Sequence, residues 1–497
     1  MGRKPPRPHA FCRTILLIGL PVAWVVATVA EAQPLRPVPG AGGRAAVAAY
    51  NRGASQMDLG NLDQAIRAFS EAVQLNPQLA RAYSSRGLAL AMQEKFDQAL
   101  ADLNRAVQLD PRDGTARFNR GFTYYRQGEL DKALPEYDAA IRLDPKHAGA
   151  YRDRGFLRAM RGDLDRAVAD LTHAIRLKPT DAAAYTSRGF AHSQRGDLDL
   201  AVADYTRAIR LDPKDAKALA DRGYARVLNG DLDPALTDLN RALELAPNDP
   251  DTLFSRGFAH FRKGDWDKAT ADYNAALKLD PEYAEVYRER GHVLAVKNQL
   301  DEALTELNRA LKLSRTDFAA WFIRGTVYLK KGDADKALAD FTEAIRINPQ
   351  HTEALFDRAM LYAARDDWDK ATNDYATVVG LQARSPKAYK QWAGDKGHAD
   401  AEKIVDRLEA LLLERKARAT EHYREAFALQ KENNLDGAIA EYGRAVATYP
   451  RYVELYFNRA IALRSKNRLS NALADYDQVI RLDPKYTMAY LNRGLIH

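Results

Sequence analysis

Apolar residues recur along this chain at helical spacing in short blocks, and the blocks repeat with one fixed period. In one block, Phe118, Phe122 and Tyr125 follow one another at spacings of four and three, as on one face of an amphipathic helix. A second apolar stripe of the same spacing runs from Ala133 to Ile141. Each block therefore predicts two consecutive helices.

Small residues and turn-forming residues keep the same period. Glycine recurs in the first helix at Gly53, Gly87, Gly121, Gly155, Gly189, Gly223, Gly257, Gly291 and Gly325. We expect it to let the two helices approach closely, and a later glycine such as Gly128 to end the first helix. We further expect the polar residue before each second stripe to cap the second helix. These predicted caps are Asp63, Asp97, Asp131, Asp165, Asp199, Asp233, Asp267, Asp301, Asp335, Asp369, Asp436 and Ser470.

The period divides the chain into ten tandem repeats over 46–385, a break over 386–418, and two further repeats plus a terminal half repeat over 419–497. Units of this length bury their apolar faces only against their neighbours. The predicted fold is therefore an all-α solenoid of antiparallel helix hairpins. In 386–418 the pattern predicts a decayed repeat followed by a long helix from about Asp400 toward Leu429. A bend or a contact surface for a second copy is the alternative for this segment.

The glycine, alanine and proline positions, with an aromatic residue or Leu four residues before each glycine, resemble the tetratricopeptide repeat family over about 46–385 and 419–497. The resemblance implies a right-handed superhelix whose first helices line a concave groove. It also implies that the chain binds peptides or partner proteins.

An arginine precedes the glycine position in the first ten repeats, and an acid follows sixteen residues later in nine of them. The clearest members are Arg86, Arg120, Arg154, Arg188 and Arg222, with Asp102, Glu136, Asp170, Asp204 and Asp238. We expect each pair to bridge the hairpin through bidentate hydrogen bonds. The alternative is that the arginines form a track for an anionic polymer, as in a carrier of envelope polysaccharide.

Aromatic side chains of the first helix are the candidate binding residues for a partner, because aromatic groups dominate interface hot spots. The candidates are Phe118, Phe122, Tyr125, Phe156, Phe190, Tyr224, Phe254, Phe258, Phe322 and Phe356. In the family that the chain resembles, these positions face or border the groove. Packing between neighbouring first helices is an equal alternative, since the core stripe and the groove stripe lie close together on one helix.

The segment 1–32 has the pattern of a secretory signal peptide. Four basic residues precede an apolar run from Thr14 to Ala30, and Ala30 and Ala32 supply a cleavage site. The segment 33–45 is rich in Pro, Gly and Ala, which is typical of a flexible linker. We therefore expect export to the periplasm or cell envelope. An uncleaved membrane anchor is the alternative for the first segment.

Sequence features of catalysis are absent. Cys12 is the only cysteine, and the ten histidines show no metal-binding pattern, so we expect no metal site and no cofactor. There is no phosphate-binding loop or nucleophile elbow. The net charge of +7 is spread among interspersed acids and bases, which does not indicate nucleic-acid binding. The sequence predicts a non-catalytic scaffold for proteins or peptides, able to self-associate through 386–418 or the C-terminal half repeat.

Overall fold

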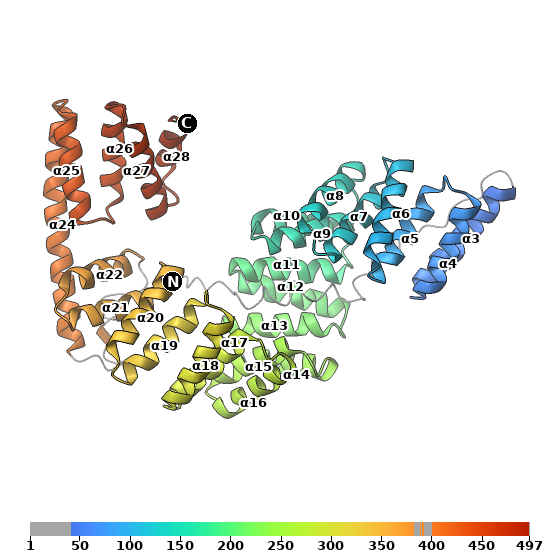
Figure 1. Ribbon diagram of the computed structural model, residues 1–497, viewed down its shortest axis with the longest axis horizontal. Coiled ribbons are helices and arrows are strands. Elements are labelled where there is room, and N and C mark those ends of the chain that lie inside the picture. Colours follow the sequence, from blue (N-terminus) through green and yellow to red (C-terminus); the bar gives the residue numbers. More distant parts are fainter. Residues whose placement is uncertain (1–40, 382–387, 389, 392–399, 497) are drawn as a thin grey trace. The chain divides into compact units, whose positions relative to one another are not determined.

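The computed structural model describes residues 41–381, 388, 390–391 and 400–496. The predicted signal peptide, the part 33–40 of the predicted linker, and residues 386–387, 389 and 392–399 of the predicted decayed repeat lie outside these residues. Every regular element within the described residues is a helix, and none is a strand (Figure 1). The first helix of the described residues begins at Ala41, so the segment 41–45 is helical, although its composition favours a linker.

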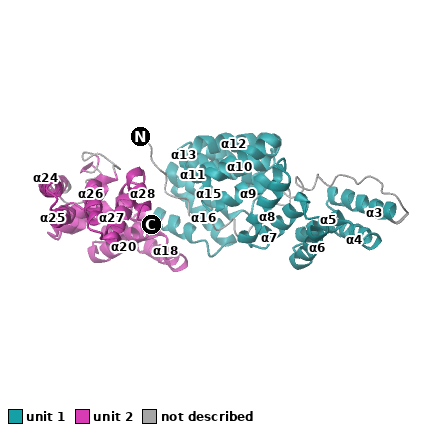
Figure 2. Cartoon of the chain, turned by 90° about the horizontal axis from the view of Figure 1, so that it is seen from above, with its two compact units in different colours: residues 1–293 teal, residues 294–497 magenta. Residues whose placement is uncertain are grey.

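The chain divides into two compact units, Met1–Val293 and Leu294–His497 (Figure 2). The hairpins of the first unit are α3 (Ala41–Asp58) with α4 (Leu62–Leu75), α5 (Ala80–Met92) with α6 (Phe96–Leu109), α7 (Gly114–Arg126) with α8 (Leu130–Leu143), α9 (Ala148–Met160) with α10 (Leu164–Leu177), α11 (Ala182–Arg195) with α12 (Leu198–Leu211), α13 (Ala216–Asn229) with α14 (Leu232–Leu245), and α15 (Pro250–Lys263) with α16 (Trp266–Leu279). Helix α17 (Ala284–Val296) contains the division. From α5 to α17, every first helix begins at the same position of its repeat, as the sequence pattern predicts.

The second unit continues the same plan. Its helices are α18 (Leu300–Leu313), α19 (Phe318–Lys330), α20 (Ala334–Ile347), α21 (Thr352–Ala363), α22 (Trp368–Gly380), α24 (Ala401–Lys431), α25 (Leu435–Thr448), α26 (Val453–Ser465), α27 (Leu469–Leu482) and α28 (Thr487–Gly494). The predicted all-α solenoid is confirmed.

The glycine near the middle of most first helices is required by the packing of the second helix. A Cβ atom on Gly155 would lie 2.7 Å from Cγ of Leu171 and 3.1 Å from the carbonyl oxygen of Ala167. On Gly257 it would lie 2.6 Å from the ring of Tyr273. The alternating Leu and Tyr residues of the second helices therefore fill the space that the missing side chains leave.

The predicted caps of the second helices are not caps. Helix α8 begins at Leu130, its N-cap is Glu129, and Asp131 lies inside the first turn. An acid there still interacts favourably with the positive end of the helix dipole. It also pairs with the following repeat, because Arg161 reaches Asp131 and Arg195 reaches Asp165. The position is thus used for contact between repeats, which a single repeat does not reveal.

Long helix α24 belongs to two layers of the second unit. Its first half packs on the hairpin α21–α22, where Val405, Leu408 and Leu412 join Tyr375 and Val378 in one buried cluster. Its second half pairs with α25 as the first helix of the next repeat. The apolar pattern that predicts a helix from about Asp400 toward Leu429 matches this element. Its length of 31 residues allows it to pack on both α21–α22 and α25.

Candidate functional site on the first helices

Helices of successive repeats contact one another unequally in the first unit. First helices pack directly on the next first helices, as in the pairs α3–α5, α5–α7, α9–α11, α11–α13 and α13–α15. Second helices contact mainly the first helix that follows, as in α12–α13 and α14–α15. First helices are therefore closer together than second helices, which places them on the inner side of the array. We call the surface of α5, α7, α9, α11, α13 and α15 on this side the inner face.

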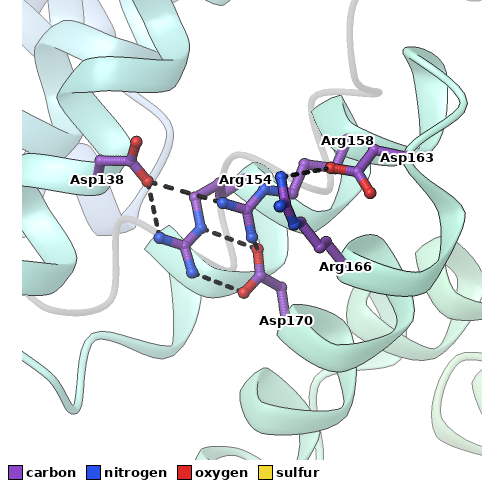
Figure 3. Close-up of polar contacts among 6 residues, drawn as sticks. All are labelled: Asp138, Arg154, Arg158, Asp163, Arg166 and Asp170. Atoms are coloured by element: carbon purple, nitrogen blue, oxygen red, sulfur yellow. Dashed lines mark hydrogen bonds and ion pairs between the residues drawn. The ribbon is translucent and has the colours of Figure 1, made fainter. Parts of the chain in front are cut away.

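The recurring spacing of arginine and acid has a clear structural role, which Arg154 illustrates (Figure 3). Its Nε and Nη2 donate to the two carboxylate oxygens of Asp170 on α10, at 2.8 and 2.6 Å. Its Nη1 donates to Asp138 on α8 of the preceding repeat, at 2.7 Å. Arg158 donates to the same Asp170 at 2.7 Å. One guanidinium thus joins three helices from two repeats.

The same arrangement recurs in both units. Bidentate pairs at 2.6–2.9 Å are Arg86–Asp102, Arg188–Asp204, Arg222–Asp238, Arg256–Asp272, Arg324–Asp340, Arg358–Asp374 and Arg459–Asp475. Arg120 donates to Glu136 through Nη2 alone, at 2.6 Å. Nη1 reaches back sixteen residues to Ser70, Asn104, Thr172, Thr206, Asn240, Asn274, Asn308 or Thr342.

These contacts decide between the two interpretations of the arginines. The side chain of Arg188 is only 20% exposed, and that of Asp204 is 8% exposed. Hydrogen bonding to Asp204 is the main cause that raises the pKa of Arg188. The arginines are engaged inside the solenoid, so they do not form an exposed track for an anionic polymer. The backward contact was not predicted from the sequence, although a polar residue stands sixteen positions before every arginine from Arg86 to Arg358.

Most of the candidate aromatic residues lie in the core. Phe118, Phe122, Phe190, Tyr224, Phe254 and Phe356 are all at most 9% exposed. The candidates that lie three positions before the glycine pack on the aromatic residue of the second helix. The ring centroids are 5.7 Å apart for Phe118 and Tyr137, and 5.8 Å apart for Phe322 and Phe341. The packing alternative therefore describes these positions.

Tyr125, Phe156, Phe258 and Phe322 are only half-buried. Among them, Tyr125 and Phe156 belong to a row that crosses three first helices. The centroid of Tyr125 on α7 lies 6.3 Å from that of Phe156 on α9, with the rings edge to face. The centroid of Phe156 lies 6.0 Å from that of Phe190 on α11. We call Tyr125, Phe156 and Phe190 the aromatic row, and its first two members retain exposed surface on the inner face.

Charged side chains adjoin the aromatic row. Arg152 on α9 donates to Asp153 at 2.7 Å and to Asp181 at 3.1 Å, and all three are nearly inaccessible to solvent. Burial raises the pKa of Asp153, with Arg152 acting in the opposite direction. Asp153 also raises the pKa of Tyr125, after the larger effect of burial. The acid is thus close to the aromatic row.

A similar acid recurs two repeats later. Burial raises the pKa of Asp221 on α13 to about 6, although Lys217, 3.4 Å away, acts in the opposite direction; the charge of Asp215 adds to the increase. Glu289 and Asp357 occupy the equivalent positions of every second repeat, and both are buried. In the sequence, these acids are recognisable because they lie two residues before the glycine position in alternate repeats.

Sequence comparisons identify the repeats. Models described as tetratricopeptide repeats match residues 50–114, 86–145, 122–188, 188–256, 259–296, 291–332, 318–351 and 423–496. The chain belongs to the tetratricopeptide repeat family. No curated protein matches it.

Several solved tetratricopeptide repeat structures are similar to this chain. The Cut9–Hcn1 tetramer of the APC/C is 14% identical, with a TM-score of 0.45, and the match covers 91% of this chain and 96% of that one. A tetratricopeptide repeat protein from Parabacteroides merdae is 18% identical, with a TM-score of 0.42, over 48% of this chain and 94% of that one. YrrB, described as having an unusual peptide-binding site, is 25% identical, with a TM-score of 0.31, over 39% of this chain and 97% of that one.

No helix among the described residues of this tetratricopeptide repeat protein is long and apolar enough to span a bilayer. The predicted anchor or signal peptide lies outside those residues.

Proposed function

We propose that this chain is a non-catalytic scaffold that holds partner proteins or peptides along the inner face of its first helices in the bacterial cell envelope. Family membership supports the general role of a protein-interaction scaffold. The aromatic row supports the proposed binding place, because Tyr125 and Phe156 offer accessible aromatic surface on two successive repeats.

The row has the properties that a binding surface needs. Tyr125 and Phe156 are held by their neighbours, so little side-chain entropy is lost when a partner covers them. Their half-buried rings present apolar area, and the buried Arg152–Asp153–Asp181 group joins α9 to the N-terminus of α11 beneath them. An extended segment lying across α7 and α9 would contact the accessible parts of Tyr125 and Phe156.

Selection of binding peptides from a random displayed library tests the place of binding. The double variant Tyr125→Ala, Phe156→Ala should lose at least tenfold in affinity for peptides selected on the native chain, because hot-spot truncations cost about 2 kcal/mol or more. Tyr124→Ala is the matched control. Tyr124 is the adjacent residue of α7, but its ring lies 5.7 Å from the ammonium of Lys132 on the second helix.

The two variants must first be compared with the native chain by circular dichroism to establish equal helix content. Unchanged peptide affinity in a folded double variant would contradict binding at the aromatic row. Equal losses in the double variant and in Tyr124→Ala would do the same, since the loss would then be a general effect on the hairpin.

The proposed location depends on the segment 1–32. A basic stretch, an apolar run and an Ala-Glu-Ala site support export and cleavage. The alternative function, a carrier of anionic polysaccharide, has lost its main support, because the arginines on which it depends are paired with acids inside the hairpins.

A further inference from the structure

One repeat departs from the arginine rule, and this departure is independent of the proposed function. In the repeat 419–452, Glu425 on α24 stands where the other full repeats have arginine. The acid sixteen residues later is retained as Glu441 on α25. Two carboxylates therefore occupy the place of an arginine and its acid, which leaves this hairpin without the usual guanidinium bridge.

Other side chains approach the buried acid instead. Glu441 is only 5% exposed. Nδ1 of His422 lies 2.8 Å from its Oε2, and Nη1 of Arg444 contacts its Oε1. His422 and Glu425 are three residues apart on α24, so both lie on the face that meets α25 at this level. The histidine and the glutamate lie at helical spacing in the sequence, although the sequence led us to expect no metal site.

The three groups form a compact set of metal ligands. One ligand atom each from His422, Glu425 and Glu441 lies within 4.8 Å of the others. No other group of three such side chains occurs among the described residues. An imidazole nitrogen with two carboxylate oxygens is a donor set that suits zinc and neighbouring divalent ions.

We propose that His422, Glu425 and Glu441 bind a divalent transition-metal ion, which joins α24 to α25 in place of the guanidinium that joins the helices elsewhere. The cation would neutralise the two carboxylates as arginine neutralises one. Zinc ligands lie about 2.0–2.2 Å from the ion, so the three atoms must draw closer together. Glu425 can supply this movement, because its side chain is exposed.

Arg444 competes with the metal for Glu441. Its side chain is 64% exposed, so it can leave the carboxylate at little cost. Removing it should therefore preserve or tighten metal binding, whereas removing a ligand should weaken it. This opposite response separates a metal site from a simple network of ion pairs.

Zinc binding to the untagged full chain, measured by competition with a chromophoric chelator, tests the proposal. His422→Ala and Glu425→Gln should each weaken zinc binding by about tenfold or more, since removing even a residue that only supports a ligand costs about 10–100-fold. Glu425→Arg, which restores the rule of the other repeats, should abolish the site. Arg444→Ala should bind zinc at least as tightly as the native chain.

Hydrogen exchange supplies a local readout. Zinc should slow exchange in the second half of α24 and in α25 of the native chain, but not in Glu425→Arg. Zinc affinity that is the same in the native chain, His422→Ala and Glu425→Gln would overturn the proposal. Loss of zinc binding in Arg444→Ala would also overturn it, because Arg444 would then be part of whatever holds the ion.

Discussion

Arg188 holds Asp204 through two parallel hydrogen bonds, from Nε at 2.8 Å and from Nη2 at 2.7 Å. The pair connects α11 to α12, and the remaining nitrogen Nη1 donates to Thr172 on α10 of the preceding repeat. This arrangement recurs along both units. A substitution at one pair therefore measures how much such a pair contributes to the free energy of unfolding.

Asp204→Ala should lower the free energy of unfolding by about 1.5–3 kcal/mol, the range for hydrogen bonds to charged groups. It leaves the largely buried guanidinium of Arg188 without its main acceptor. Denaturant unfolding followed by circular dichroism measures the effect. Asp199→Ala is the comparison and should cost less, since this acid lies exposed on the same helix and accepts one long hydrogen bond, from Asn229 at 3.3 Å. Equal stability of the native chain and Asp204→Ala would count against the pairing as a source of stability.

Gly155→Ala should destabilise the hairpin α9–α10 by about 1–3 kcal/mol, the usual cost of overpacking. The new methyl group would meet Leu171 and the backbone of Ala167 at distances that require a shift. A double-mutant cycle with Leu171→Ala checks the cause. If crowding by Leu171 is responsible, the two changes together should cost less than their sum. Additive effects would exclude that explanation.

Asp221→Asn should stabilise the chain at pH 7. The folded carboxyl has a pKa of about 6 against an ordinary value of 3.8, so it keeps its proton where the unfolded chain has released it. Its ionisation therefore lowers stability as the pH rises from about 4 to about 6. The difference between the two pKa values corresponds to at most about 3 kcal/mol. Loss of the ion pair with Lys217 should cost little free energy, because half of the Lys217 side chain is exposed to solvent.

Unfolding measured between about pH 4 and pH 8 tests this expectation. Asp221→Asn should show a smaller fall in stability across that range than the native chain. Asp58→Asn, which changes an exposed acid on α3, should leave the pH profile nearly unchanged. Identical profiles for the native chain and Asp221→Asn would show that burial does not raise this pKa.

The mature protein recovered from the cell envelope should begin at Gln33, because cleavage is expected after Ala32. Mass spectrometry of its N-terminal peptide tests this directly. Ala32→Leu should block cleavage by enlarging a position that requires a small residue, while Gln33→Asn should not. A mature protein that retains Met1 would favour the uncleaved anchor instead.

The sequence predicted the helices and the arginine–acid pairs because each depends on residues within one repeat. It could not place Phe118 or Phe156, because residues of the core and of the inner face are neighbours on the same helix, and only the packing of other helices on them separates the two sets. The predicted caps were wrong because Leu130 is already helical, so that Asp131 lies inside the first turn. The partner of Asp131, Arg161, belongs to the following repeat, which the pattern of one repeat does not contain.

Most of the arginines from Arg86 to Arg358 contact an acid sixteen residues later and a polar residue sixteen residues earlier, which has a consequence for how such a chain can change its length. Among these repeats, removal or duplication of one complete repeat restores an arginine, an acid and a polar acceptor at the new junction. Recombination in whole repeats therefore preserves the hydrogen bonds between repeats. Gain or loss of part of a repeat would leave buried guanidinium groups without either the acid or the backward acceptor.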